Sequence, residues 1–144
     1  MFNRILVPLE HSPTDDTILA YVRLLSRACK SSLVLIHVAD GWAARNLKQL
    51  DLKESEEMKD DRVYLETKAD DLRREGYDCD SVLAAGDPAK EIAETATREG
   101  CDLIAMATHG HRGLSDVVKG SVASELRHIT MIPVLMVRAT KAVS

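Results

Sequence analysis

The sequence predicts a single doubly wound α/β domain of the Rossmann-like type, in which helices flank a five-stranded parallel sheet. Short apolar runs alternate along the chain with segments of helical periodicity. The apolar runs are nearly continuous, as in strands that are covered on both faces. The length of 144 residues suits one core rather than two, so we expect one domain over residues 1–144.

The first half of the chain predicts two strands, each followed by a helix. The strand at Ile5–Val7 leads into a helix that Ser12 or Thr14 would cap. The second strand, Leu33–Val38, precedes an irregular stretch and a long amphipathic helix that stops at Gly76. We interpret the many charges of this long helix as its solvated face. The apolar positions are Ile18, Tyr21 or Val22, Leu25 and Cys29 in the first helix, and Met58, Leu65, Ala69 and Leu72 in the second.

The second half predicts three more strands and two more helices. A strand at Tyr77–Ala85 ends in Gly86-Asp87-Pro88, which we interpret as turn, helix cap and first helical residue. That helix ends at Gly100, and a strand at Leu103–Ala107 follows. The final strand is Val134–Val137. The helix before it has its apolar stripe at Val122, Leu126 and Ile129.

Composition disfavours several classes of function. The chain is 45% apolar and 29% charged with a formal net charge of -4, so it lacks the basic excess of nucleic-acid binders. No apolar stretch approaches the roughly 18 residues that span a bilayer, and the first strand leaves no room for a signal peptide. We therefore expect a cytoplasmic protein that binds neither nucleic acid nor membrane. Cys29, Cys79 and Cys101 form no C-x-x-C pair, so we interpret them as small apolar residues.

A glycine-punctuated segment follows the fourth predicted strand. From Thr108 to Ser121 the chain reads T-H-G-H-R-G-L-S-D-V-V-K-G-S, and nine residues separate Gly110 from Gly120. Backbone N–H groups near these glycines, with a helix that begins around Gly120 and Ser121, predict a phosphate-binding loop. Alternatively, the glycines are turn residues of a surface loop and Ser121 is only a helix cap.

The carboxyl ends of the first and fourth predicted strands indicate where a ligand would bind. Ligands of doubly wound sheets lie beyond such ends, where the strand order reverses direction. The first strand ends in Pro8-Leu9-Glu10 and the fourth in Ala107-Thr108-His109-Gly110. If the two strands are neighbours, Glu10 can accept hydrogen bonds from ribose hydroxyls while the glycine-punctuated segment holds a polyphosphate. These residues predict a nucleotide site.

The sequence disfavours metal binding and dedicated catalysis. His109, His111 and His11 lack cysteine or acidic ligands at the spacing of a zinc site, so we expect no protein-bound metal. His109 can in principle act as a general acid or base near a phosphate. However, no Walker lysine follows the loop and no paired Asp residues suit two metal ions. We therefore assign no catalytic residue and expect slow hydrolysis at most.

Three motifs together resemble the universal stress protein family of the UspA type, over the whole length of the chain. I-L-V-P-L-E-H-S is similar to the family's I-L-V-P-L-D-G-S, and Gly86-Asp87-Pro88 matches its recurrent G-D-P. A-T-H-G, followed by nine residues and G-S, resembles its ATP-binding signature. The resemblance implies a doubly wound sheet of strand order 3-2-1-4-5, adenine-nucleotide binding, a homodimer and a part in stress responses.

The family's signature maps onto Ala107, Gly110, Gly120 and Ser121, with alanine in place of the first glycine. Glu10 stands where the family has a ribose-binding Asp, and its side chain is one methylene longer. The implied ligand is ATP or another adenine nucleotide, with the presence of Mg²⁺ left open. The implied nucleotide-binding residues are Pro8, Leu9, Glu10, Val38, Ala107, Thr108, His109, Gly110, Gly120, Ser121, Val122 and Ala123.

Three hypotheses about function follow. The leading one is a regulatory or protective module that responds to stress and whose conformation or partner surface depends on bound nucleotide. The second is a weak ATPase or self-phosphorylating protein with Ser121 or Thr108 as the acceptor. The third is a nucleotide-free dimeric interaction protein. In each case we expect a homodimer through Val134–Val137, because an apolar strand at a sheet edge has unpaired backbone groups.

Overall fold

The computed structural model describes residues 1–39, 56–109 and 114–139, with the backbone alone at 109 and 114–121. Within these ranges five parallel strands form one sheet in the order β3-β2-β1-β4-β5. The doubly wound sheet and its strand order are as predicted. The strands are β1 (Arg4–Pro8), β2 (Ser32–Ala39), β3 (Cys79–Ala85), β4 (Leu103–His109) and β5 (Val134–Ala139).

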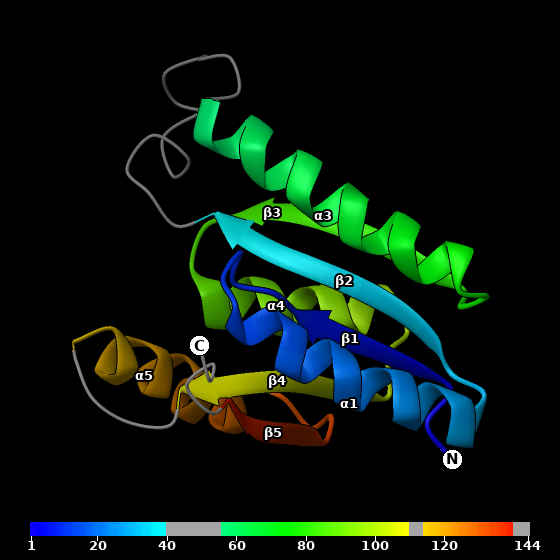
Figure 1. The fold of residues 1–144 in the computed structure, drawn as a ribbon. Coiled ribbons are helices and arrows are strands. Elements are labelled where there is room, and N and C mark those ends of the chain that lie inside the picture. Colours follow the sequence, from blue (N-terminus) through cyan, green and yellow to red (C-terminus); the bar gives the residue numbers. More distant parts are fainter. Residues whose placement is uncertain (40–55, 110–113, 140–144) are drawn as a thin grey trace.

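Four described helices cover the two faces of the sheet (Figure 1). They are α1 (Thr14–Cys29), α3 (Glu56–Arg74), α4 (Pro88–Arg98) and α5 (Leu114–Ile129). Helices α1 and α3 pack on one face, and α4 and α5 pack on the other. No helix in the described ranges is both long enough and apolar enough to cross a membrane.

Alternate side chains of β1 fill two apolar cores. Ile5 and Val7 pack with residues of α1 and α3, whereas Leu6 packs with residues of α4 and α5. All three side chains are fully buried. Each contributes about 1.5–3 kcal/mol relative to an exposed position. Because β1 lies between β2 and β4, its carboxyl end is flanked by the ends of both neighbours.

The start of α4 agrees with the sequence, and the start of α1 does not. The Asp87 carboxylate accepts a hydrogen bond from a backbone N–H of the first turn of α4, and Pro88 is the first helical residue. In α1 the N-cap position is Pro13, and no side chain caps it. The predicted cap by Ser12 or Thr14 is therefore wrong. Their hydroxyls lie 2.8 Å apart and hydrogen-bond to each other.

Helix α5 begins earlier than the glycine pattern predicts. Its first residue is Leu114, so Gly120 and Ser121 lie inside the helix and not at its N-terminus. The prediction that Ser121 is a helix cap is wrong. A single glycine inside a helix costs about 1 kcal/mol, which does not end a helix that packing stabilises.

The three cysteines are free thiols, as the sequence predicts. Cys79 and Cys101 are buried, and Cys29 is half-buried. Burial raises the pKa of the Cys79 thiol to about 12 and that of Cys101 to about 11. Both thiols are therefore uncharged near neutral pH and pack as small apolar groups.

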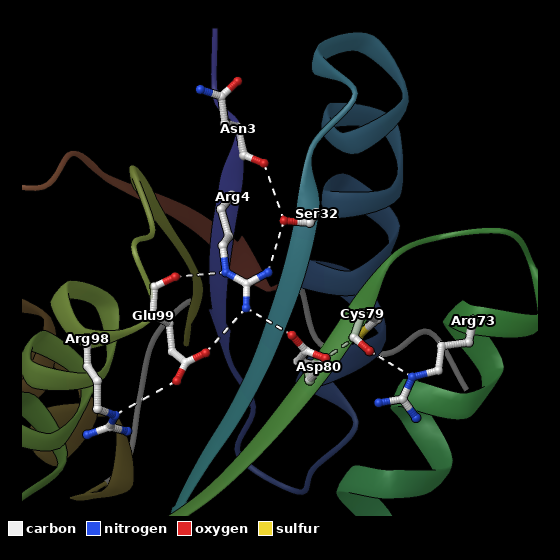
Figure 2. Close-up of polar contacts among 8 residues, drawn as sticks. All are labelled: Asn3, Arg4, Ser32, Arg73, Cys79, Asp80, Arg98 and Glu99. Atoms are coloured by element: carbon white, nitrogen blue, oxygen red, sulfur yellow. Dashed lines mark hydrogen bonds and ion pairs between the residues drawn. The ribbon is translucent and has the colours of Figure 1, made fainter.

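Arg4 connects four segments at the amino end of the sheet (Figure 2). Its Nε–H donates to the Glu99 carbonyl at 2.9 Å, and Nη1 donates to the Ser32 hydroxyl at 3.1 Å. Nη2 donates to Asp80 Oδ2 at 2.9 Å and to Glu99 Oε1 at 3.3 Å. These contacts join β1 to β2, to β3 and to the connection after α4. Arg4 thus fixes the amino ends of neighbouring elements.

We predict that Arg4→Met lowers the free energy of unfolding by about 1–3 kcal/mol, because it removes several charge-assisted hydrogen bonds and leaves their acceptors unpaired. Arg74→Met is the matched control. The Arg74 side chain is 74% exposed and pairs with Asp71 within α3 at 3.3 Å, so its loss changes stability by less than about 1 kcal/mol. Guanidinium unfolding curves measure both values, and equal losses would contradict the prediction.

Candidate functional site

A cavity of about 490 Å³ lies at the carboxyl ends of β1, β2 and β4. Part of its lining is apolar and comes from β1 and the residue after it, from β2 and β4, and from α4 and α5. The other part, which we call the polar wall, comes from β2, α3 and the segment after β1. The apolar part is lined by Pro8, Leu9, Ile36, Val38, Ala39, Pro88, Ile92, Met106, Ala107 and Val122. The polar wall is lined by Glu10, His11, His37, Glu57, Asp60 and Asp61.

Half of the residues predicted to bind nucleotide line this cavity. They are Pro8, Leu9, Glu10, Val38, Ala107 and Val122. Two more have described side chains but lie outside the lining, namely Thr108 and Ala123. For His109, Gly120 and Ser121 only the backbone is described, and Gly110 lies outside the described residues. Strands β1 and β4 are neighbours, so the ends on which the prediction depends do lie side by side.

Ala107 fits the end of β4 without backbone strain. Its residue is 8% exposed, and it belongs to the apolar cluster beneath α1 and α3 as well as to the cavity lining. Among the described residues, the only non-glycine positions with positive φ are His11 and Lys30. Ala107 therefore needs no left-handed backbone of the kind that only glycine adopts freely. Replacement of the family's glycine by alanine is structurally accommodated here.

Glu10 is half-buried and is held by the start of α1. Its Oε2 accepts a hydrogen bond from the Thr14 hydroxyl at 3.0 Å. The Thr14 hydroxyl also lies 2.8 Å from that of Ser12. The longer side chain of Glu10, compared with aspartate, is thus matched by a partner within the same turn. The carboxylate still lines the cavity.

Asp15 organises the turn between β1 and α1 from a buried position. It is 1% exposed and accepts hydrogen bonds from the backbone N–H groups of Glu10 at 2.8 Å and His11 at 2.9 Å. It also accepts one from the Tyr64 hydroxyl at 2.6 Å. Burial, followed by the hydrogen bond to Asp15, raises the pKa of Tyr64. The turn is therefore tied directly to α3.

Asp61 of α3 lies between two histidines in the polar wall. Its Oδ1 is 2.8 Å from His11 Nδ1, and its Oδ2 is 3.3 Å from His37 Nε2. His37 Nδ1 lies 2.8 Å from the Leu9 carbonyl oxygen. The His11 ring stacks on Tyr64 with centroids 3.9 Å apart at 25°. The cluster joins α3, β2 and the segment after β1.

The charges of α3 are therefore not all a solvated face, which corrects the interpretation drawn from the sequence. Asp61 is buried, and Glu57 and Asp60 line the cavity. A signal for Asp61 was present, because it stands three residues after Met58 and four before Leu65, within the apolar stripe of the helix. A carboxylate at such a position needs a partner, and no local pattern names His11 or His37.

Despite its two histidines, the polar wall does not resemble a metal centre. Within the described ranges, no group of three or more His, Cys, Asp or Glu side chains is arranged to hold a metal ion. The histidine side chains of the glycine-punctuated segment lie outside what the structure describes.

Comparison with known proteins shows that nearly the whole chain is similar to one family. The sequence matches the universal stress protein family over residues 1–138. This chain belongs to that family. Universal stress protein MJ0577 of Methanocaldococcus jannaschii is 26% identical over 158 residues, which cover 96% of each protein. A solved structure of MJ0577 has a TM-score of 0.73 and 25% identity, and 99% of both chains is covered.

Two further universal stress proteins share the fold. One was solved in complex with cAMP and has a TM-score of 0.75 at 16% identity, with 96% of this chain and 99% of that chain covered. The other, from Archaeoglobus fulgidus, was solved in complex with dAMP and has a TM-score of 0.69 at 17% identity. It covers 93% of this chain and 96% of its own. At these identities the likeness establishes a common fold.

We predict that Asp15→Ala lowers the free energy of unfolding of this universal stress protein by about 2–3 kcal/mol, because buried N–H donors lose their acceptor. Asp16→Ala is the control. The Asp16 side chain is 79% exposed and lies 3.5 Å from Lys68 Nζ, so its removal changes stability by less than about 1 kcal/mol. Urea unfolding of both variants measures the difference. A smaller loss for Asp15→Ala than for Asp16→Ala would show that the buried carboxylate does not organise the turn.

Proposed function

We propose that the cavity binds an adenine nucleotide and that the chain, as a single domain in the cytoplasm, is a nucleotide-dependent regulatory or protective module of the stress response. The observation that carries the proposal is the two-sided lining of the cavity. It offers apolar residues for a base and polar residues for a sugar, at the sheet edge where doubly wound folds bind ligands. The relatives solved with cAMP and dAMP support the same ligand class.

The carboxylates of the polar wall favour one orientation of the nucleotide in the cavity. Four carboxylates line the polar wall, from Glu10, Glu57, Asp60 and Asp61. A phosphate placed against them would be repelled. The base therefore packs on Val38 and its apolar neighbours, the sugar faces the polar wall, and the phosphates lie beyond Ala107, where the sequence continues into its glycine-punctuated segment. In this orientation the triphosphate of ATP, with or without Mg²⁺, lies away from the carboxylates of α3.

Binding is favoured over catalysis by the same lining. The described part of the cavity presents no lysine or arginine side chain toward a transferring phosphoryl group. A role in which nucleotide occupancy stabilises one conformation needs no such group. We therefore place hydrolysis second to binding.

We predict that the wild-type chain is stabilised by AMP or ATP, by about 2.7 kcal/mol at a ligand concentration of 100 times Kd. Val38→Phe places a larger ring in the cavity and weakens binding by about tenfold or more. Val63→Phe is the control, because Val63 is 66% exposed on α3 and lies outside the cavity lining. Thermal melts and calorimetric titrations give both quantities. A melting temperature that millimolar AMP and ATP leave unchanged would overturn the proposed function.

We also propose a homodimer through β5. This strand is at the edge of the sheet, and its outer backbone groups have no neighbouring strand among the described residues. Leu135 and Met136 are exposed on it, although both are apolar. Pairing of two copies across a twofold axis satisfies the edge and covers these side chains.

We predict that the wild-type chain sediments as a dimer at micromolar concentration and that Met136→Glu shifts it toward the monomer. A charge at an apolar interface is desolvated without a partner, which weakens association. Leu24→Glu is the control, because Leu24 is 65% exposed on α1 and not on β5. Analytical ultracentrifugation distinguishes the species. A monomeric wild-type chain, or equal effects of the two variants, would refute assembly through β5.

A further inference from the structure

His11 lines the cavity, and one of its ring nitrogens has no hydrogen-bond partner among the described residues. Its Nδ1 is 2.8 Å from Asp61 Oδ1, and the residue lines the cavity. No hydrogen bond or ion pair joins its Nε2 to another described residue. The ring stacks on Tyr64 and lies edge-on to the ring of His37, with centroids 6.3 Å apart. One ring nitrogen of His11 thus holds the side chain in place, and the other is available to a ligand.

The hydrogen bond to Asp61 decides what the open nitrogen can do. A carboxylate accepts hydrogen bonds, so the proton of a neutral His11 ring resides on Nδ1. Nε2 then carries a lone pair and is an acceptor. A neutral acceptor recognises a hydroxyl group without the strong attraction for cations that a carboxylate also has.

Asp61 and Tyr64 hold the ring in place. Asp61 is itself held by His37, which lies 3.3 Å from its Oδ2. Tyr64 stacks on the ring, and its hydroxyl donates to the buried Asp15 at 2.6 Å. The orientation of His11 is therefore set before any ligand arrives, which lowers the entropic cost of forming a hydrogen bond there.

The rest of the polar wall also lacks competing donors. Glu10, Glu57 and Asp60 line it with carboxylates. Its complement is a group with several O–H donors and no negative charge, and within a nucleotide that group is the sugar. His11 is the member of this wall whose second ring nitrogen has no hydrogen-bond partner among the described residues.

We propose that His11 determines sugar specificity, accepting a hydrogen bond at Nε2 from a ribose hydroxyl of the bound nucleotide, with Asp61 as its positioning residue. This inference rests on the proposed nucleotide binding and goes beyond it, because it assigns the recognition of one chemical group to one atom. The 2′- and 3′-hydroxyls are the two sugar O–H donors of AMP, and the experiment distinguishes them.

The test compares AMP with 2′-deoxy-AMP and 3′-deoxy-AMP by calorimetric titration at pH 8. The wild-type chain is expected to bind AMP about 5- to 20-fold more tightly than one of the deoxy analogues. The analogue that loses affinity identifies the hydroxyl. Equal Kd values for all three nucleotides would overturn the inference and leave nucleotide binding intact. Failure of AMP to bind would overturn both.

Two substitutions of His11 assign the preference to its ring nitrogen. His11→Phe keeps a ring against Tyr64 and removes the acceptor. His11→Gly removes the side chain and suits the backbone, because φ at this residue is 62°. Both are expected to reduce the preference for AMP to less than about twofold. His128→Phe, at an exposed position near the end of α5, is the control that keeps it. A preference that survives in both His11 variants would overturn the inference.

Asp61→Asn tests positioning separately from stability. The amide that faces His11 can donate a hydrogen bond to Nδ1, which moves the ring proton to Nε2 and turns the acceptor into a donor. The expected result is a folded chain, verified by circular dichroism, whose AMP to deoxy-AMP affinity ratio falls toward 1. A purely structural role of Asp61 would weaken all three nucleotides equally and keep the ratio, and that result would refute positioning.

Discussion

The buried carboxylate of Asp15 is the contact on which the geometry of the cavity depends. It accepts hydrogen bonds from the consecutive backbone N–H groups of Glu10 and His11, and from the hydroxyl of Tyr64 on α3. One side chain thus sets the turn that follows β1 and the position of the helix that faces it. The polar wall assembles because these two segments are held together. The direct contact of His11 with Asp61 adds to this link, and Glu10, His11 and Asp61 line one cavity.

The two ends of β1 carry opposite electrostatic arrangements. At the amino end, the guanidinium of Arg4 donates hydrogen bonds to acceptors from neighbouring elements (Figure 2). At the carboxyl end, carboxylates line a cavity of about 490 Å³. The first arrangement satisfies its charges internally and stabilises the fold. At the carboxyl end, hydrogen-bond acceptors line the cavity, as expected of a binding site.

Much of the fold could be predicted from the sequence, because local patterns determine it. Apolar runs mark the strands, and the G-D-P segment marks the start of α4, with Asp87 as the cap. Sequence patterns gave wrong predictions where the structure depends on contacts between residues far apart in the chain. Pro13 is the N-cap of α1, and Asp15 rather than a capping side chain holds the turn before it, while α5 continues through Gly120. The contact of His11 with Asp61 spans 50 residues, so no spacing rule predicts it. Pro8 of β1, Val38 of β2 and Ala107 of β4 line the cavity as predicted, whereas the acidic residues of α3 in its polar wall were not predicted from the sequence.

The left-handed backbone of His11 has a consequence for attempts to stabilise this protein. A non-glycine residue at φ 62° carries a conformational penalty of roughly 1 kcal/mol, which glycine would relieve. Backbone strain and side-chain contacts therefore place opposing demands on one position. Glycine would relieve the strain, but it would also remove the hydrogen bond to the buried Asp61 and the ring nitrogen that we assign to sugar recognition.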